Sequence, residues 1–326
     1  MGIVFSDRQL EAAVRTGLDD VESALLEAVR SDDEFVAGAA SYLVDAGGKR
    51  FRPMVSLLAA HFGDPTRPEI VPAAVVVELT HLATLYHDDV MDEAAVRRGA
   101  PSANARWDNT VAILTGDFLF SRASNLLADL GPYAVRLQAR TFERLVSGQI
   151  RETVGPQDGA DRIDHYLTVL ADKTGSLIAT AAEFGAHYAD VDAEAIRTLR
   201  RFGEQIGIAF QISDDILDIA SDSADSGKTP GTDLREGVAT LPVLYALRSD
   251  DAAGERLRDL VCGPLLDDDT HAEALALLRA SAAMDEARAT LQSYADSAGD
   301  TLVDLPDVPA RAALEVLTNT VIARTG

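Results

Sequence analysis

The 326-residue sequence has one cysteine, only three lysines and few aromatic residues. The single thiol, Cys262, excludes an internal disulfide and a metal site built from cysteines, and it favours a reducing, cytoplasmic compartment. A formal net charge of -24 means that the chain lacks the basic footprint by which proteins bind nucleic acid or anionic membranes. With 47% apolar residues, the chain can nevertheless bury a large core.

Long uninterrupted apolar runs are also missing. The most apolar window, VPAAVVVELTHLATLY at 71–86, carries Glu78 and His81 and is shorter than the ~20 residues of a membrane-spanning helix. The N-terminal segment MGIVFSDRQLEAAVR has no basic region followed by an apolar core. We therefore expect neither a transmembrane segment nor a signal peptide.

Strands with alternating polarity and hairpin turns are absent too, whereas helical periodicity is frequent. Leu10, Val14, Leu18 and Val21, for example, recur at spacings of four and three, which places one apolar stripe on a helix. The pattern predicts an N-terminal helix within 1–30 and further helices over 71–92, 109–129, 134–153, 163–189, 193–221, 239–249, 271–281, 284–297 and 309–324. We expect an all-α fold in which residues 1–326 form a single domain.

Polar residues, glycine and proline separate these helices at 63–68, 155–161 and 221–233. The last break, SDSADSGKTPGTD, is long and polar, which is typical of a mobile loop over an active site. An ordinary surface loop has the same composition, so this reading depends on the motifs around it.

Two acidic hexapeptides, HDDVMD at 87–92 and SDDILD at 213–218, each follow an apolar helical run. They carry two matching sets of aspartates: Asp88, Asp89 and Asp92, then Asp214, Asp215 and Asp218. The first and last members of each set share a helix face, where like charges repel, while the middle member is rotated by roughly 100°. Carboxylates without cysteine or imidazole partners suit magnesium, so we predict that both sets bind this ion.

A group of basic residues accompanies the acidic motifs. Its members are Lys49, Arg50 and Arg52 in AGGKRFRP, Arg97 and Arg98 in RRG, Lys173 in DKTG, and Lys228 in SGKTPGTD. Guanidinium forks and lysine charges bind phosphate oxygens. Magnesium and these basic residues together indicate a site for diphosphates. Bound metal would neutralise a diphosphate and make it a good leaving group. If the diphosphate is allylic, its departure produces a carbocation that a second alkene can attack.

From about Gly47 to the C-terminus, the sequence closely resembles the trans-isoprenyl diphosphate synthases, the polyprenyl synthetase family. The segments that carry the resemblance occur in the family's order: GGKRFRP, HDDVMDEAAVRRG, GDFLFSRA, KTG, FQISDDILD, GKTPGTDLREG and TLP. The resemblance implies a homodimer of the isoprenoid synthase helical bundle, with the two acidic motifs facing each other across a deep central cavity. It also implies a magnesium-dependent prenyltransferase, with about three ions in the loaded site, that joins isopentenyl diphosphate head to tail to an allylic diphosphate.

The same resemblance implies roles for individual residues. The metal ligands are Asp88, Asp92 and Asp214, supported by Asp89, Asp215 and Asp218. Isopentenyl diphosphate is held by Lys49, Arg52, His81 and Arg98, and the allylic diphosphate by Arg97, Lys173 and Lys228. Thr174 and Gln211 lie near the developing cation, so the residues expected to act in catalysis are Asp88, Asp92, Lys173, Thr174, Gln211 and Asp214. Val238 stands where many relatives carry a lysine, so one diphosphate contact is expected to be absent or supplied by Arg235.

Product length is expected to depend on the residues beneath the first acidic motif. Thr84 lies one helical turn below Asp88, next to Ala83, and both side chains are small. Short-chain relatives carry bulky aromatics there, and Phe118, followed by Leu119 and Phe120, is a candidate for a deeper floor. We therefore expect products of about C30 to C50, as used for quinone side chains, rather than a C20 geranylgeranyl product.

Other functions fit parts of this pattern. A terpene cyclase shares the acidic motif and a helical fold, but it does not need Lys49, Arg52 and Arg98 for a second diphosphate. A non-catalytic partner subunit typically lacks aspartates that are all present here. A calcium-binding protein would need alternating oxygen ligands and a central glycine, which the acidic motifs do not have.

Overall fold

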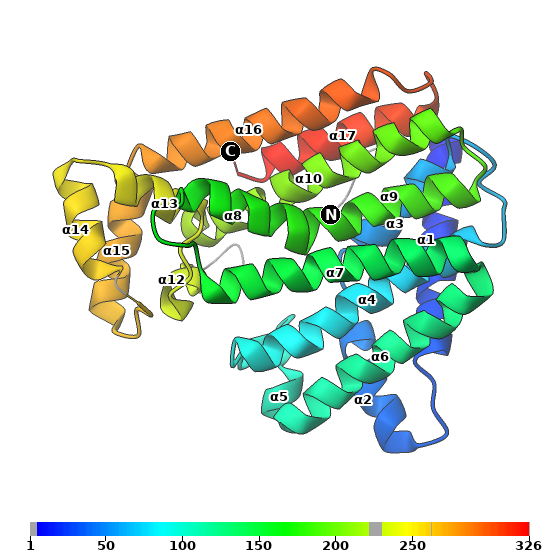
Figure 1. Cartoon of the computed structure of the whole chain (residues 1–326), viewed down its shortest axis with the longest axis horizontal. Helices are drawn as coiled ribbons and strands as arrows, with labels where there is room; N and C mark the ends of the chain where they lie inside the picture. Colours follow the sequence, from blue (N-terminus) through cyan, green and yellow to red (C-terminus); the bar gives the residue numbers. More distant parts are fainter. Residues whose placement is uncertain (1–4, 222–229, 262, 326) are drawn as a thin grey trace. The chain divides into compact units, whose positions relative to one another are not determined.

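The structure, a computed structural model, describes residues 5–221, 230–261 and 263–325 and confirms the predicted all-α fold (Figure 1). The chain divides into two compact units. The first unit comprises Met1–Glu143, Leu177–Gly203 and Thr301–Val316, and the second comprises Arg144–Ser176, Glu204–Asp300 and Leu317–Gly326. A single domain over 1–326 stays a prediction.

The elements of the first unit are α1 (Arg8–Ala28), α2 (Glu34–Asp45), α3 (Phe51–Ala60), α4 (Ile70–Met91), β1 (Val96–Arg97), β2 (Ala100–Pro101), α5 (Ala103–Arg106) and α6 (Asn109–Leu130). Those of the second are α8 (Arg162–Leu170), the π-helix η1 (Ala171–Gly175), α12 (Thr232–Glu236), α13 (Leu241–Arg248), α14 (Ala252–Leu260) and α15 (Asp268–Ala280). Five further helices have residues in both units: α7 (Pro132–Val154), α9 (Ser176–Tyr188), α10 (Ala193–Ala220), α16 (Ala283–Leu302) and α17 (Pro309–Ala323).

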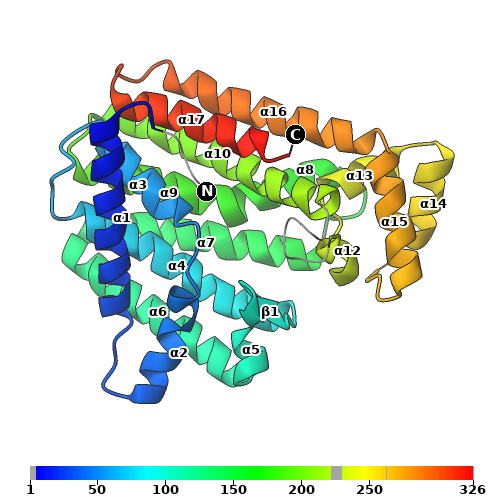
Figure 2. The same ribbon diagram turned by 180° about the vertical axis from the view of Figure 1, so that it is seen from behind.

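The core helix of the first unit is α4. Helices α1, α3 and α6 pack against it (Figure 2), and Val75, Val76 and Leu79 are buried. With 22 residues, α4 is long and apolar enough to cross a membrane, so the expectation that this run is too short is wrong. Because 67% of its apolar window is buried inside the protein, its composition is explained by its place in the core.

Glycine allows α9 to approach α3 at backbone contact distance. The Ser56 hydroxyl on α3 donates to the carbonyl oxygen of Ala181 on α9 at 2.8 Å. A Cβ atom added to Gly185 would lie 1.9 Å from the Ser56 carbonyl oxygen, which is shorter than any contact that a real Cβ atom makes. Gly185, in the sequence GAHY, is therefore needed for the close packing of α9 on α3, and helical periodicity does not reveal this need.

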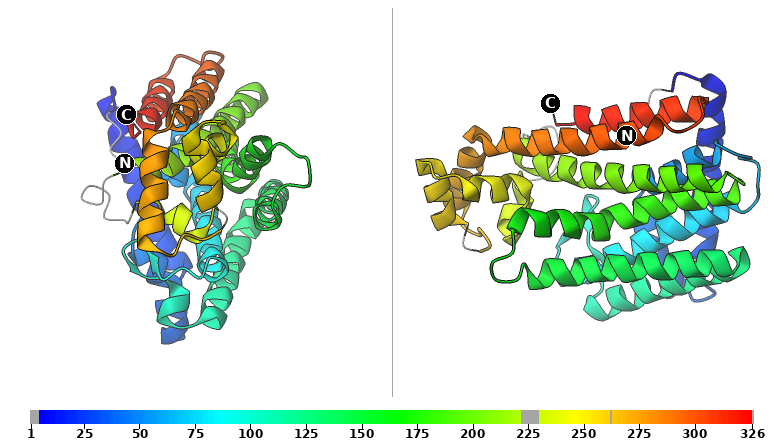
Figure 3. Two further views of the ribbon diagram at one scale, coloured as in Figure 1. Left: turned by 90° about the vertical axis from the view of Figure 1, so that its left-hand side faces the viewer. Right: turned by 45° about the horizontal axis from the view of Figure 1, so that its top comes forward.

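In the second unit, α13, α14 and α15 pack on one another (Figure 3). The last two begin at aspartate caps: the Asp251 carboxylate accepts from the Gly254 amide at 2.7 Å, and Asp267 accepts from the Thr270 amide at 2.9 Å. These caps satisfy amides that a helix start leaves without partners, and they fix where the helices begin.

The segment 163–189, predicted as one helix, consists of α8, η1 and α9. The apolar stripe continues through all three, so periodicity does not show that one turn is wider than the rest. A π-turn rotates the residues within it relative to an ideal α-helix, and such turns are frequent at functional sites. The DKTG segment, with Lys173 and Thr174, lies in this turn.

The sequence pattern also misses several short elements. Helix α3 has no polar face, because nine of its ten residues are buried. Helices α2 and α14 are also missed because they are short. A hairpin occurs where none is predicted: Val96 pairs with Pro101 and Arg97 with Ala100. Its turn residues, Arg98 and Gly99, have φ values of 53° and 79°, which is typical of a type I′ turn.

Candidate active site

In the first unit, the acidic motif lies at the C-terminal end of α4. Asp88 is half-buried and Asp92, the C-cap residue, is exposed, whereas Asp89 is 0% exposed. The rotation predicted for the middle aspartate is thus present. Carboxylates at a helix C-terminus meet the negative end of the helix dipole, so this arrangement favours a cation beside Asp88 and Asp92.

Asp89 is engaged by a partner from the hairpin. Its Oδ1 accepts from Arg97 Nε at 2.6 Å, while its Oδ2 is buried and has no hydrogen bond within the described part of the chain. Burial raises the pKa of the Asp89 carboxyl, and the Arg97 guanidinium opposes that rise. Arg97, predicted to hold the allylic diphosphate, is bonded to the acidic motif itself.

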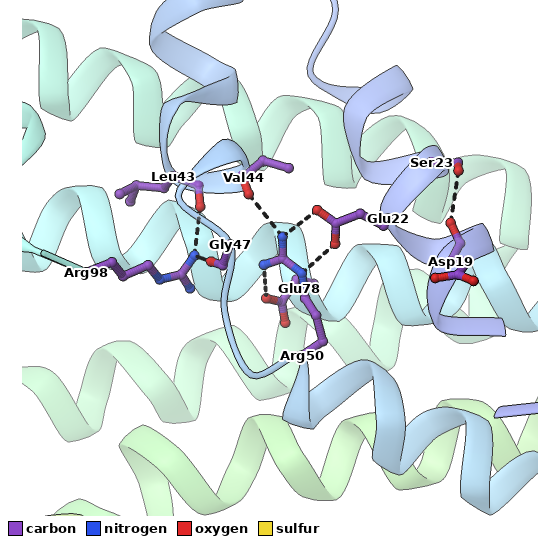
Figure 4. A network of polar contacts seen from close by, with 9 residues as sticks. All are labelled: Asp19, Glu22, Ser23, Leu43, Val44, Gly47, Arg50, Glu78 and Arg98. Carbon is purple, nitrogen blue, oxygen red and sulfur yellow. Dashed lines mark hydrogen bonds and ion pairs between the residues drawn. The ribbon is translucent and has the colours of Figure 1, made fainter. Parts of the chain in front are cut away.

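The other predicted cations of the first unit surround the segment that precedes α3. Arg98 Nη1 donates to the Leu43 carbonyl oxygen at 2.7 Å and to that of Gly47 (Figure 4). Lys49 is exposed and Arg52 is partly buried. The two φ-positive residues of the 46–52 segment, Gly47 and Arg50, turn the chain so that consecutive basic residues point in different directions.

His81 lies among these arginines on α4. Burial holds the pKa of its imidazole well below the ordinary value, and the charges of Arg52, Arg98, Arg97 and Arg50 lower it further. The ring is therefore neutral at physiological pH, and the surroundings are strongly electropositive. A neutral imidazole is able both to donate and to accept a hydrogen bond, which suits a residue predicted to hold isopentenyl diphosphate.

The residues predicted to set product length lie on α4 and α6. Ala83 is fully buried, and the Thr84 hydroxyl donates to the His81 carbonyl oxygen at 2.8 Å. A Cβ atom on Gly116 of α6 would lie 3.0 Å from the Ala83 carbonyl oxygen, so the two helices are in close contact here. Phe118 is partly buried against the same core, and the Arg122 guanidinium lies over its ring at 4.8 Å.

In the second unit, the acidic motif lies near the C-terminal end of α10. Asp214 is partly exposed and forms an ion pair with Arg324 Nη2. The Arg324 guanidinium also lies 5.1 Å from the centre of the Phe210 ring. Sequence reasoning misses Arg324, because 110 residues separate it from Asp214 and no local motif marks it.

Asp215 is buried in a network of hydrogen bonds. The Tyr166 hydroxyl donates to its Oδ2, and Gln211 Nε2 donates to its Oδ1 at 2.9 Å. The Thr174 hydroxyl in turn donates to Gln211 Oε1 at 3.4 Å. Burial raises the pKa of Asp215 to about 7. The structure thus joins three predicted residues, Thr174, Gln211 and Asp215, and adds Tyr166, which the sequence does not indicate.

Asp218 holds the start of α12. Its two carboxylate oxygens accept from the amides of Thr232 and Asp233, both at 3.1 Å. Lys173 Nζ lies 2.6 Å from Glu152 Oε2, an acidic partner on α7 that sequence reasoning also misses. Lys228 and residues 222–229 of the predicted mobile loop lie outside the described residues.

Arg235, considered as a substitute for the lysine that Val238 replaces, has other partners. Its Nη2 donates to Asp268 at 2.6 Å, and its Nη1 donates to the Leu266 carbonyl oxygen at 3.3 Å. Val238 is 40% exposed. These contacts favour the alternative in which one diphosphate contact is absent.

Comparisons with known proteins identify the family of the chain. A family model described as Polyprenyl synthetase matches residues 33–278. Nonaprenyl diphosphate synthase of Mycobacterium tuberculosis is 50% identical over 326 residues, which cover 100% of this chain and 97% of that protein. The chain belongs to the polyprenyl synthetase family.

Solved structures of the family have the same fold. The crystal structure of geranylgeranyl pyrophosphate synthase from Corynebacterium glutamicum, complexed with calcium and isoprenyl diphosphate, superposes with a TM-score of 0.89. It is 49% identical, and the match covers 99% of this chain and 100% of that one. Heptaprenyl diphosphate synthase component 2 of Geobacillus stearothermophilus is 37% identical over 300 residues, 91% of this chain and 92% of that protein. The predicted family membership is therefore confirmed.

The carboxylates fit the kind of ion that polyprenyl synthetases use. Within residues 5–221, 230–261 and 263–325, no three His, Cys, Asp or Glu side chains gather at metal-binding distance. Magnesium is typically held by one or two carboxylates together with water and substrate phosphates, so it does not need such a cluster. Asp88 and Asp92 are suited to this ion by position, and the Arg324 cation beside Asp214 marks a place where positive charge is favourable.

Proposed function

We propose that this polyprenyl synthetase performs successive head-to-tail condensations of isopentenyl diphosphate with an allylic diphosphate. The product would be a trans-polyprenyl diphosphate of about C30 to C50, since the residues beneath Asp88 are small and no bulky aromatic side chain stands there to stop a growing tail. The observation that carries the proposal is the presence of both complete aspartate motifs in a chain 50% identical to a nonaprenyl diphosphate synthase over its whole length. Such an enzyme would act in the cytoplasm.

The proposed roles of the chain's residues follow from their chemistry. Asp88, Asp92 and Asp214 would hold magnesium, which when bound neutralises the leaving diphosphate. Asp89, Asp215 and Asp218 would support them through the bonds to Arg97, Tyr166 and the α12 amides. Lys49, Arg52, His81 and Arg98 would orient isopentenyl diphosphate, while Arg97, Lys173 and Lys228 would hold the allylic diphosphate.

Two polar residues would stabilise the positive charge that develops on the allylic carbon. The Thr174 hydroxyl and the Gln211 amide are fixed by each other and by Asp215. Fixed dipoles contribute more to catalysis than mobile ones, because they need no reorganisation when charge develops. The network around Asp215 therefore supports the catalytic roles proposed for Thr174 and Gln211.

We also propose a homodimer. Two large apolar side chains of α6, Ile113 and Leu114, are 42% and 60% exposed in the single chain. Neighbouring exposed apolar residues on a long helix are typical of a surface that a second copy covers. A helix that pairs with its own counterpart would bury both residues.

The C20 product is the second candidate, because the 49% identical solved structure is a geranylgeranyl pyrophosphate synthase. The deciding experiment is to incubate the purified chain with magnesium, labelled isopentenyl diphosphate and each of the C5, C10, C15 and C20 allylic diphosphates, then size the dephosphorylated products. Thr84→Phe should shorten the product by filling the space one turn below Asp88. Thr16→Phe, at an exposed position on α1, is the matched control.

A product ladder that ends at or above C30, and that Thr84→Phe shortens, would support the proposed function. A ladder that stops at C20 would replace it with geranylgeranyl diphosphate synthesis. No product with any primer would contradict a self-sufficient synthase. It would point either to a required second subunit or to a cyclase. The heptaprenyl relative is itself named as component 2 of its synthase.

A further inference from the structure

Arg50 differs from its basic neighbours in being buried and strained. It precedes α3 in a left-handed conformation, with φ 45° and ψ 37°, and only 9% of the residue is exposed. A non-glycine residue rarely adopts this conformation, so surrounding contacts must hold it there.

Four hydrogen bonds hold the Arg50 guanidinium (Figure 4). Nε and Nη2 donate to the two carboxylate oxygens of Glu22 on α1, at 2.7 and 2.8 Å. Nη1 donates to Glu78 Oε1 on α4 at 3.0 Å, and Nη2 also donates to the Val44 carbonyl oxygen of α2 at 3.2 Å. A single side chain thus connects the turn before α3 to three other helices.

These bonds exclude Arg50 from phosphate binding, contrary to the sequence reading that grouped it with Lys49 and Arg52. The fork that would recognise a phosphate is already bound to a carboxylate in bidentate geometry. The charge of Arg50 is also balanced, because Glu22 and Glu78 both contact it. Its role must therefore be exerted through the backbone that it fixes.

Glu78 also serves the second arginine of this region. Both guanidiniums lie close to Gly48: a Cβ atom on this glycine would be 3.0 Å from Arg98 Nη2 and 3.2 Å from Arg50 Nη1. Burial lowers the pKa of the Arg98 guanidinium; the charge of Glu78 opposes that fall, and the charge of Arg50 adds to it. Because Glu78 is only 2% exposed, it is a buried carboxylate that offsets the repulsion between two close arginines.

We propose that Glu22, Arg50 and Glu78 form a positioning triad that holds the 46–52 turn and Arg98 in place for the diphosphate of isopentenyl diphosphate. Arg50 is a positioning residue, and Lys49 and Arg52 on either side of it are the groups that would contact the substrate. The triad also makes α1 part of the substrate site, through Glu22. This inference rests on the proposed function.

The test is the steady-state kinetics of Arg50→Lys and Glu22→Gln. Lysine keeps the charge but loses the fork, so the turn is no longer fixed and KM for isopentenyl diphosphate should rise about tenfold or more. The kcat value at saturation should change by less than about threefold, and KM for the allylic diphosphate should be unchanged. Glu22→Gln should shift KM in the same direction by a smaller factor. Arg15→Lys, which alters the exposed Arg15–Glu11 pair on the same helix, is the control and should not change KM.

A general loss of stability would change both KM values and lower the melting temperature, so both are measured in every variant. Equal changes in the two KM values, or no change in either folded variant, would overturn the triad. If Arg50→Lys does not fold, Glu22→Gln decides the question, because the Glu22 side chain is 40% exposed. A wild-type enzyme without prenyltransferase activity would instead refute the proposed function, so the two failures are distinguishable.

Discussion

The two acidic motifs are alike as sequences, but individual aspartates within them have different surroundings. Asp89 and Asp215 are buried and accept hydrogen bonds from Arg97 and Tyr166, respectively. Asp88 is half-buried, and Asp214 lies beside the guanidinium of Arg324. Under the proposed function, the first residue of each motif would bind magnesium, while the buried second residue makes hydrogen bonds to the surrounding protein.

Asp88→Asn and Asp214→Asn should each lower kcat by about 10³-fold or more, because each removes a negative charge that attracts magnesium but keeps the shape of the side chain. Turnover with labelled substrates measures the loss, and circular dichroism checks the fold. Asp20→Asn, at an exposed position on α1, should leave kcat unchanged. Wild-type turnover in a folded Asp88→Asn or Asp214→Asn variant would contradict the metal assignment.

Individual elements depend on features that are not visible in helical periodicity. The π-turn η1 places Thr174 next to Gln211. The Arg98–Gly99 turn sends Arg97 to Asp89 and Arg98 to the end of α2. In both cases a local departure from ideal geometry directs a polar side chain, which is typical of functional sites.

Gly185→Ala should destabilise the protein by about 1 to 3 kcal/mol, since the added methyl group would overlap the Ser56 backbone and push α9 away from α3. The matched control is Gly38→Ala in α2, where a Cβ atom would meet nothing within 4 Å. That substitution should be neutral or stabilise by up to about 1 kcal/mol, because alanine is the better helix former. Thermal unfolding compares the two variants, and equal midpoints would show that the α3–α9 approach is not tight.

At the scale of the whole molecule, a net charge of -24 coexists with exposed apolar residues on α6. Like-charged copies repel at long range, so a stable dimer needs an apolar surface whose burial exceeds that repulsion. Salt screens the repulsion between the copies but does not weaken the favourable free energy of burying apolar surface. Dimerisation should therefore strengthen with ionic strength.

Leu114→Asp should convert the proposed dimer into a monomer, because a carboxylate would have to be buried opposite its own copy. Light scattering coupled to size exclusion at micromolar concentration gives the mass directly. Val303→Asp is the control, since Val303 is 75% exposed and lies outside the helices, and it should leave the mass unchanged. A monomeric wild type, or a Leu114→Asp variant that remains dimeric, would refute the proposed use of α6.

The sequence by itself determined the helical class, the positions of most long helices and the six aspartates, because apolar periodicity and short motifs are local properties of the chain. Only the tertiary structure decided which acidic and basic residues satisfy one another. Arg50 looks like a third phosphate ligand in GGKRFRP until Glu22 and Glu78, each 28 residues away, are seen to hold it. Tyr166 reaches Asp215 across 49 residues and Arg324 reaches Asp214 across 110. Such pairs form only when helices pack, and no local pattern in a single sequence specifies which distant charges will meet.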